Sequence, residues 1–282
     1  MSIAGGVDKA LVRGLDVGCD SIQIFTKNNN QWRAKPLSDR EIMTYHKNRE
    51  VAGIWPVIAH DGYLINVASP KKDLYKKSLE ALGTEIERAT ALEIPYLVIH
   101  PGAHLGVGEA EGIKRVVEAL DTIFERTEAS PVMICLETTA GQGSSLGYRF
   151  EHLAAIREGV KRRERVGICL DTCHILAAGY EIRGLEPYEQ TMRQLDDAIG
   201  LDHLKCIHLN DSQGVLGSRL DRHAHIGQGQ IGLEGFRILV NDPRLRHLPM
   251  ILETPKGDDP AATDRRNLAV LRSLLRGQGP GG

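Results

Sequence analysis

The sequence lacks a long apolar segment, a metal-binding cysteine pair and an excess of basic residues. No hydrophobic run approaches the ~18 residues that cross a membrane, and the opening residues, MSIAGGVDK, lack the basic and apolar regions of a signal peptide. The five cysteines are odd in number and form no CxxC pair, and Cys135, Cys169 and Cys206 lie inside apolar runs. This pattern favours reduced core thiols over a disulfide framework and disfavours cysteine ligands. We therefore expect a cytoplasmic protein with no membrane contact and with reduced thiols.

Basic residues do not exceed acidic ones, and the formal net charge is −2. This balance alone argues against nucleic-acid binding, which usually requires a basic surface. A length of 282 residues with 41% hydrophobic residues suits one large domain over 1–282. The terminal stretch 277–282, GQGPGG, is predicted to be a flexible tail.

Short runs rich in Val, Ile and Leu alternate with amphipathic segments of helical length. The runs are nearly continuous in apolar residues, as expected for parallel strands buried on both faces. They are Ser21–Phe25, Trp55–His60, Tyr96–His100, Val132–Glu137, Val166–Asp171, Leu204–Asn210 and Pro249–Glu253. This alternation predicts a single α/β TIM barrel of the (β/α)8 type. Since only seven strands are evident, we expect the first strand to be truncated or very short at the N-terminus.

Six of the seven predicted strands finish in, or close to, a histidine or a carboxylate. In a barrel these ends converge on the catalytic face, so residues distant in sequence should meet there. The six residues are His60, His100, Glu137, Asp171, His208 and Glu253.

Two short motifs add three further candidates at the same face. Asp171-Thr-Cys-His174 places a carboxylate and an imidazole three residues apart, and Asp221-Arg-His223 lies in a glycine-rich loop. The nine nitrogen and oxygen donors suit zinc, or manganese or iron, more than calcium or magnesium. They exceed the needs of one tetrahedral ion and suffice for two or three.

Single residues of this kind often have a purely structural role. A lone histidine at a strand end is usually a hydrogen-bonded core residue, and DxxH occurs by chance in many chains. Repetition at equivalent strand ends is what favours a metal site. His104 and His225 lie in loops of the same face, and we expect them to support the metal ligands.

Seven ordered motifs span nearly the whole chain and resemble those of the endonuclease IV family. The motifs are HDGYLINVA from His60, HPGAH from His100, LETTAGQG from Leu136, LDTCHILAAGY from Leu170, HLNDS from His208, DRHAHIGQGQIG from Asp221 and LETP from Leu252. The resemblance implies a DNA-repair nuclease on a TIM barrel. It would hydrolyse the phosphodiester 5′ to abasic sites in duplex DNA, leave a 3′-hydroxyl and clean 3′-blocked ends.

The resemblance also implies three zinc ions held by the nine residues. His60, His100 and Glu137 would hold one ion. Glu137, bridging, would hold the second ion with Asp171, His208 and Glu253, and His174, Asp221 and His223 would hold the third. Glu137 is the expected catalytic residue, and three divalent ions would turn a formal net charge of −2 into +4.

The expected DNA contacts lie on two loops and in the Asp221 motif. In the family, a loop after the first complete strand penetrates the duplex, and here it reads FTKNNNQWR from Phe25. Family members often carry an arginine where this chain has Asn30. The full set of expected contacts is Asn30, Gln31, Tyr63, Leu64, Lys27, Arg33 and Arg222.

A metal-dependent sugar isomerase or epimerase is the alternative, since such enzymes use carboxylate–histidine sites on the same barrel. They usually need one or two ions, so the nine-donor set favours the nuclease. A monomer suits a protein that bends around DNA, and we expect one here.

Overall fold

The computed structural model describes residues 1–276, so the predicted tail lies outside the described residues. Seven strands form one parallel sheet in the order β1-β2-β3-β4-β5-β6-β9. These are β1 (Ile22–Phe25), β2 (Val57–His60), β3 (Tyr96–Ile99), β4 (Met133–Glu137), β5 (Val166–Asp171), β6 (Leu204–His208) and β9 (Met250–Ile251). The short strands β7 (Asp211–Ser212) and β8 (His223–Ala224) form a separate antiparallel pair.

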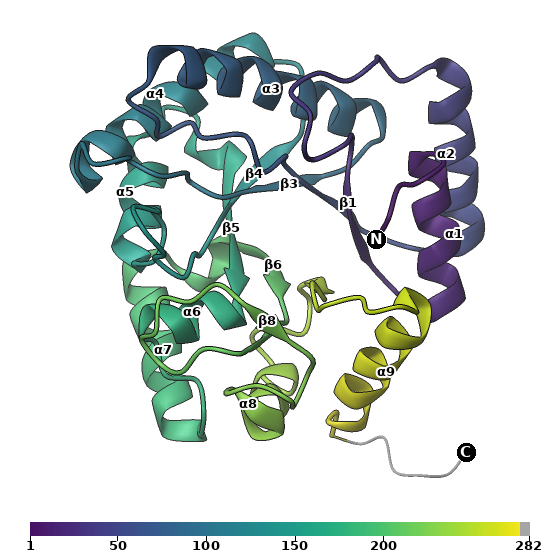
Figure 1. Ribbon diagram of the computed structural model, residues 1–282, viewed down its shortest axis with the longest axis vertical. Helices are drawn as coiled ribbons and strands as arrows, with labels where there is room; N and C mark the ends of the chain where they lie inside the picture. The colour runs from purple at the N-terminus through teal and green to yellow at the C-terminus, as the bar shows by residue number, and fades with distance from the viewer. Residues whose placement is uncertain (277–282) are drawn as a thin grey trace.

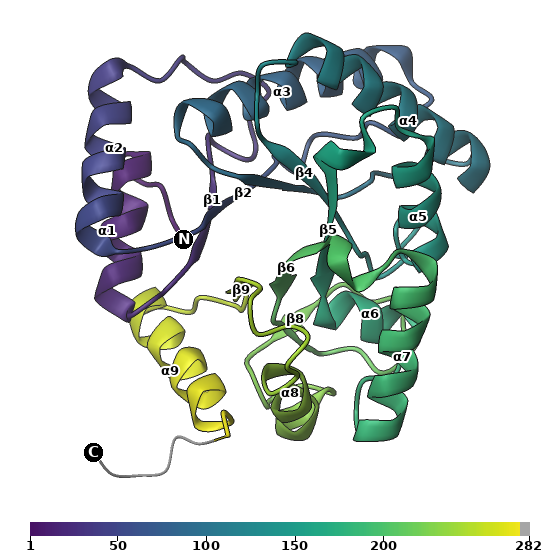
Figure 2. The same cartoon turned by 180° about the vertical axis from the view of Figure 1, so that it is seen from behind.

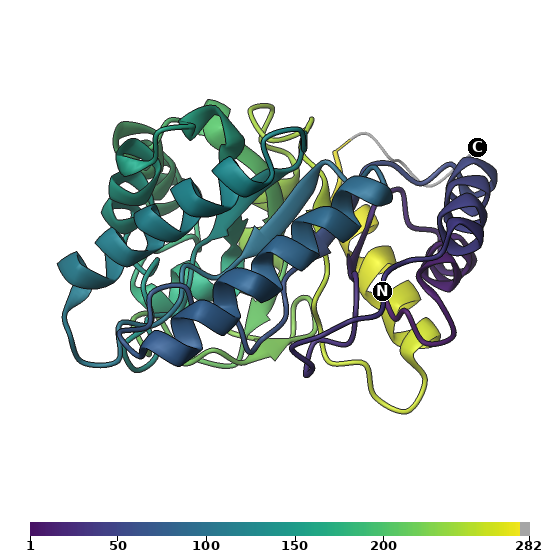
Figure 3. The same ribbon diagram turned by 90° about the horizontal axis from the view of Figure 1, so that it is seen from above.

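Helices surround the sheet as an outer ring (Figure 1). They are α1 (Val7–Val17), α2 (Asp39–Ala52), α3 (Lys72–Ala91), α4 (Glu109–Arg126), α5 (Phe150–Gly159), α6 (Thr172–Ala178), α7 (Leu185–Ala198), α8 (Gly232–Val240) and α9 (Pro260–Ser273). The ring closes where α9 packs against both α8 and α1, as the view from behind also shows (Figure 2). Seen from above, the helices again lie outside the strands (Figure 3). The predicted TIM-barrel fold is confirmed.

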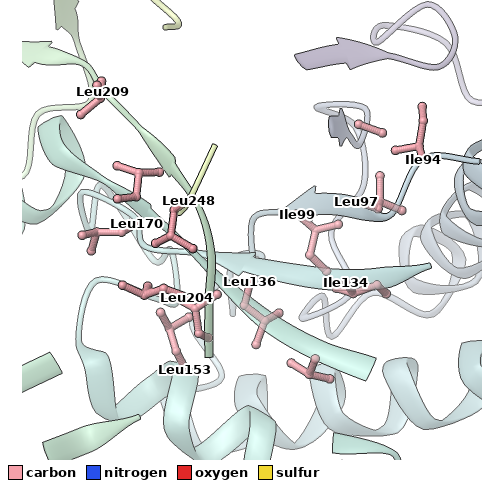
Figure 4. Close-up of a cluster of buried hydrophobic side chains, with 14 of the residues drawn as sticks. Ile94, Leu97, Ile99, Ile134, Leu136, Leu153, Leu170, Leu204, Leu209 and Leu248 are labelled. Atoms are coloured by element: carbon pink, nitrogen blue, oxygen red, sulfur yellow. The ribbon is translucent and has the colours of Figure 1, made fainter. Parts of the chain in front are cut away.

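Leucine and isoleucine side chains fill the layer between strands and helices. The pleat turns alternate residues of each strand outward, so Leu97 and Ile99 of β3 lie beside Ile134 and Leu136 of β4 in one cluster (Figure 4). Leu153 of α5 packs into the same cluster. This layer fixes each helix to its strand and so fixes where each strand ends.

A second, smaller cluster fills the inside of the barrel. Each of its buried members lies two residues before one of the predicted metal ligands, and they are Ile58, Val98, Cys135, Cys169, Cys206 and Ile251. Because side chains two apart in a strand share a face, this layer lies directly beneath the ligand layer.

All five cysteines are free thiols, as predicted. No described helix is both long and apolar enough to cross a bilayer.

The sheet stays open along one seam. Among residues 1–276 no strand lies between β9 and β1, which agrees with the seven strands counted in the sequence. A cavity of about 560 Å³ occupies this seam, lined by Ile22, Ile251 and Leu271 among other side chains. The ring of helices is therefore closed, whereas the sheet inside it stays open between β9 and β1.

Candidate metal centre

The nine candidate donors gather at the carboxyl-terminal ends of the strands. His60, Glu137, Asp171 and His208 are the last residues of β2, β4, β5 and β6. Within three groups, every member offers a ligand atom within 4.8 Å of the others. The groups are His60–His100–Glu137, Glu137–Asp171–His208–Glu253 and Asp171–His174–His223.

Glu137 lies at the centre of the site and is fully buried. Its Oε2 atom is 3.1 Å from Nε2 of His60 and 3.0 Å from Nε2 of His100. Its Oε1 atom is 2.9 Å from Nδ1 of His208, in the second group. Each carboxylate oxygen thus faces a different group, which is the arrangement that a bridging ligand requires.

Asp171 links the second group to the third. Its Oδ2 atom is 3.7 Å from Nδ1 of His208. Its Oδ1 atom accepts a hydrogen bond of 2.8 Å from the backbone N–H of His174 and so caps the start of α6. The cap explains the three-residue spacing, because it sets the turn that brings His174 back over the strand end.

The third group differs from the expected set in one member. The mutually close atoms belong to Asp171, His174 and His223, whereas the resemblance implies Asp221. Asp221 nevertheless contacts both imidazoles, with Oδ1 3.1 Å from Nε2 of His174 and 3.7 Å from Nε2 of His223. The structure therefore places two carboxylates around this histidine pair.

Two buried nitrogen atoms test whether these residues fit a metal. Nε2 of His174 and Nε2 of His223 are buried and have no hydrogen-bond partner among the described residues. Unsatisfied buried nitrogens are costly, and the carboxylate of Asp221 lies 3.1 and 3.7 Å from them without completing a hydrogen bond. A metal ion would satisfy them, since imidazole nitrogen and carboxylate oxygen are ordinary zinc ligands. The donor set fits the group that the sequence implied.

Without metal, the imidazoles and carboxylates of the site change each other's pKa. Burial opposes the charged form of His60, His174 and His208, but the nearby carboxylates outweigh it and raise the pKa of each. Burial would raise the pKa of Glu137, but the imidazoles of His208 and His100 hold it well below its usual range. Metal must therefore displace protons from this site.

The metal-free protein should lose stability as the pH rises above about 6.5, the ordinary histidine pKa. Histidines with a raised pKa bind protons that the unfolded chain has released, so their contribution is complete below that pH and disappears as the pH passes through their raised pKa. We expect the Tm of chelator-treated protein to fall over this interval, measured by thermal unfolding in buffers of equal ionic strength. A Tm that rises instead would contradict the ion pairing.

Backbone carbonyl oxygens orient three of the imidazoles. Nδ1 of His60 hydrogen-bonds to the carbonyl oxygen of Asp61 at 2.9 Å, and Nδ1 of His174 to the carbonyl oxygen of Thr138 at 2.8 Å. Nδ1 of His223 lies 3.1 Å from the carbonyl oxygen of Glu253. Each contact engages Nδ1 and leaves Nε2 directed at the site.

Sequence reasoning missed two amide side chains that support the ligands. Gln23 of β1 accepts from Nε2 of His208 at 2.8 Å and donates from its own Nε2 to Glu253 at 2.7 Å. Asn210 donates to Oδ2 of Asp171 at 2.7 Å and accepts from the backbone N–H of Glu253 at 2.8 Å. A polar residue inside the apolar run Ile22-Gln23-Ile24 was the signal that could have revealed Gln23.

Replacing Gln23 by leucine should lower zinc affinity about 10- to 100-fold, the usual effect of losing a partner that orients a ligand. The variant removes both hydrogen bonds while keeping the side-chain volume close. Gln23→Glu is the matched control, because it can still accept from His208. Competition with a chromophoric chelator measures the affinities, and equal affinity for Gln23→Leu and the parent would contradict this role.

Most of the expected DNA contacts are exposed on loops beside the metal centre. Asn30, Gln31, Arg33 and Arg222 are exposed, and Tyr63 has 66% of its surface accessible. Leu64 is half-buried. The rings of Tyr63 and Phe25 pack edge to face with centroids 5.3 Å apart, so the loop after β2 touches the end of β1.

Three expectations about side chains at this face need correction. Lys27 is buried and paired with Glu85, so its ammonium is not exposed for a phosphate. Nδ1 of His104 accepts from the backbone N–H groups of Gly106 and Gly108, and Nδ1 of His225 contacts Asn267. Both histidines organise loops, and among residues 1–276 neither hydrogen-bonds to one of the nine candidate donors.

A parallel barrel with three histidine–carboxylate groups at its carboxyl-terminal face defines a metal-dependent TIM-barrel enzyme. Residues 12–274 match the family described as xylose isomerase-like TIM barrel. The probable endonuclease 4 of Chloroflexus aggregans is 57% identical over 276 residues, covering 98% of this chain and 96% of that protein. The probable endonuclease 4 of Geobacter sulfurreducens is 51% identical, with 98% and 93% covered.

Among solved structures, endonuclease IV from Thermus thermophilus superposes with a TM-score of 0.86 at 37% identity, covering 98% of this chain and 97% of that one. This chain belongs to the endonuclease IV family. A D-psicose 3-epimerase from Clostridium cellulolyticum matches at a TM-score of 0.69 and 16% identity, over 95% and 93% of the two chains. That likeness extends to the fold alone.

Proposed function

We propose that this protein is a DNA-repair endonuclease that hydrolyses the phosphodiester 5′ to abasic sites in duplex DNA, leaving a 3′-hydroxyl, and also cleans 3′-blocked ends. A relative that is 57% identical is named probable endonuclease 4. The proposal depends on the position of Glu137. Its two carboxylate oxygens face different donor groups, and the loop with the exposed Tyr63 lies beside them. Residues 1–282 would act as one catalytic domain, as a monomer in the cytoplasm.

Three zinc ions would be held by the nine donors, with manganese or iron as substitutes. His60 and His100 would hold one ion with Glu137. Asp171, His208 and Glu253 would share the second with Glu137, and His174, Asp221 and His223 would hold the third. Bound zinc supplies charge neutralisation for the phosphate and an ionised water near neutral pH.

The side chains around the site have separate roles in the proposed reaction. The carboxylate of Glu137 keeps two donor groups at a fixed separation, and the carbonyls behind the imidazoles hold each Nε2 in place. Tyr63 and Leu64 would fill the gap left by an extruded nucleotide, a step that costs least where no base pairs or stacks. Asn30, Gln31, Arg33 and Arg222 would contact the backbone and the opened strand.

The test is cleavage of a duplex oligonucleotide carrying one abasic analogue, with zinc content measured on the same sample. Incision on the 5′ side by protein holding about three zinc ions supports the proposal. Fully loaded protein that leaves the duplex intact would refute it. Assays on small sugars would then examine the isomerase or epimerase alternative, which usually needs one or two ions.

A further inference from the structure

Lys27 and Glu85 form a buried ion pair behind the loop expected to enter DNA. Nζ of Lys27 is 3.2 Å from Oε1 of Glu85, and their side chains are 4% and 1% exposed. Lys27 lies two residues after β1, and Glu85 lies on α3. Buried charges are uncommon unless paired, and a pair of this kind can serve to fix one conformation.

The pair belongs to a set of contacts that ties residues 26–35 to α3. Nζ of Lys27 donates to the carbonyl oxygen of Gln31 at 2.7 Å, and the hydroxyl of Thr26 donates to Glu85. Arg88, one turn further along α3, donates to the carbonyl oxygen of Thr26 at 3.0 Å and to that of Lys35 at 2.6 Å. Both ends of the exposed segment Asn28–Gln31 are therefore fixed.

The ammonium of Lys27 also lies against the loop that follows β2 and holds Gly62 and Tyr63. A Cβ atom built on Gly62 would lie 3.1 Å from the carbonyl oxygen of Asn29 and 3.2 Å from Nζ of Lys27. Only glycine permits this approach without displacement, and the next residue, Tyr63, packs its ring against Phe25. Lys27 thus lies at the junction of the two loops.

We propose that the Lys27–Glu85 ion pair is a positioning device that holds segment Asn28–Gln31 against the Gly62–Tyr63 loop and thereby sets discrimination between abasic and intact duplex DNA. Lys27 acts through the loop and does not touch a phosphate, because its ammonium is engaged by Glu85 and Gln31. The predicted effect on DNA discrimination rests on the proposed function. The positioning of segment Asn28–Gln31 by the ion pair can be measured without DNA.

The first measurement is hydrogen exchange of the amides of residues 28–32 in the metal-loaded protein. We expect faster exchange in Lys27→Met and in Glu85→Gln, and no larger change in the double variant, because all three lose the same ion pair. Tyr188→Phe is the control: it removes a buried hydrogen bond to Asp242 between α7 and the chain after α8. Unchanged exchange in both single variants would overturn the inference, whatever the protein does to DNA.

The second measurement is abasic-duplex binding and incision at several salt concentrations. We expect the preference for abasic over intact duplex to fall roughly tenfold in Lys27→Met through KM, with zinc content unchanged. The slope of log affinity against log salt should stay that of the parent, whereas loss of a phosphate contact would reduce it by about 0.9. A reduced slope, or full discrimination in the variant, would overturn the inference. Absence of incision by the parent protein would refute the proposed function. The hydrogen-exchange measurement would then decide whether the Lys27–Glu85 pair positions the loop.

Discussion

Glu137→Gln should reduce incision at an abasic site on the order of 10³-fold, the loss typical when a group that stabilises transition-state charge is removed. The carboxylate offers one oxygen to the His60–His100 pair and the other to His208. An amide keeps the shape of the side chain but replaces one oxygen by an N–H₂ that cannot bind metal. Whichever way the amide turns, one group loses its oxygen donor, and the other keeps a neutral carbonyl oxygen in place of a charged carboxylate oxygen.

The loss should fall on kcat, with the Kd for abasic duplex within about threefold of the parent, because DNA binding uses the loops. Incision rate, Kd and metal content are measured on the same preparation. Glu109→Gln is the matched control: its carboxylate lies outside the three groups and bonds to the hydroxyl of Tyr148 at 2.6 Å. Unchanged turnover in Glu137→Gln would refute the bridging role.

The barrel could be predicted because each strand carries its own local signal. The run Val166–Asp171 is the observed β5, since a continuous apolar run bounded by polar turns allows little else. The last strand was predicted over Pro249–Glu253 but spans only Met250–Ile251. On its other side, at the open seam, β9 pairs with no strand among residues 1–276, so the ladder is short there. The apolar run of one strand does not show which residues of it will pair with a neighbouring strand, so the strand's length could not be predicted.

The metal centre was predictable for a different reason, which is the geometry of parallel strands. Once seven strands point the same way, their terminal histidines and carboxylates must share one face. The groups that orient them were not predictable in the same way. Gln23 and Asn210 are ordinary amides, and their roles depend on distances between strands far apart in sequence. The burial of Lys27 was missed because its partner lies on α3, beyond the next helix and strand of the chain.

Replacing Tyr63 and Leu64 together by alanine should weaken binding to abasic duplex on the order of 10²-fold, the sum expected when stacking surfaces next to a base are lost. Tyr63 is the large exposed aromatic of the loop that follows β2, and His60 lies only three residues before it. A ring held at its edge by Phe25 can enter a stack with little further loss of freedom.

The effect should be confined to damaged DNA and should leave the metal centre unchanged. His60 is oriented by the carbonyl oxygen of Asp61, which the substitutions leave in place. Zinc content of the double variant should therefore equal that of the parent. Binding is measured with duplexes that differ only in the abasic position. Val51→Ala provides a matched control, because it removes an exposed apolar side chain from α2. If affinity for both duplexes fell equally, Tyr63 and Leu64 would be general DNA contacts, and their proposed role in filling the gap left by an extruded nucleotide would be wrong.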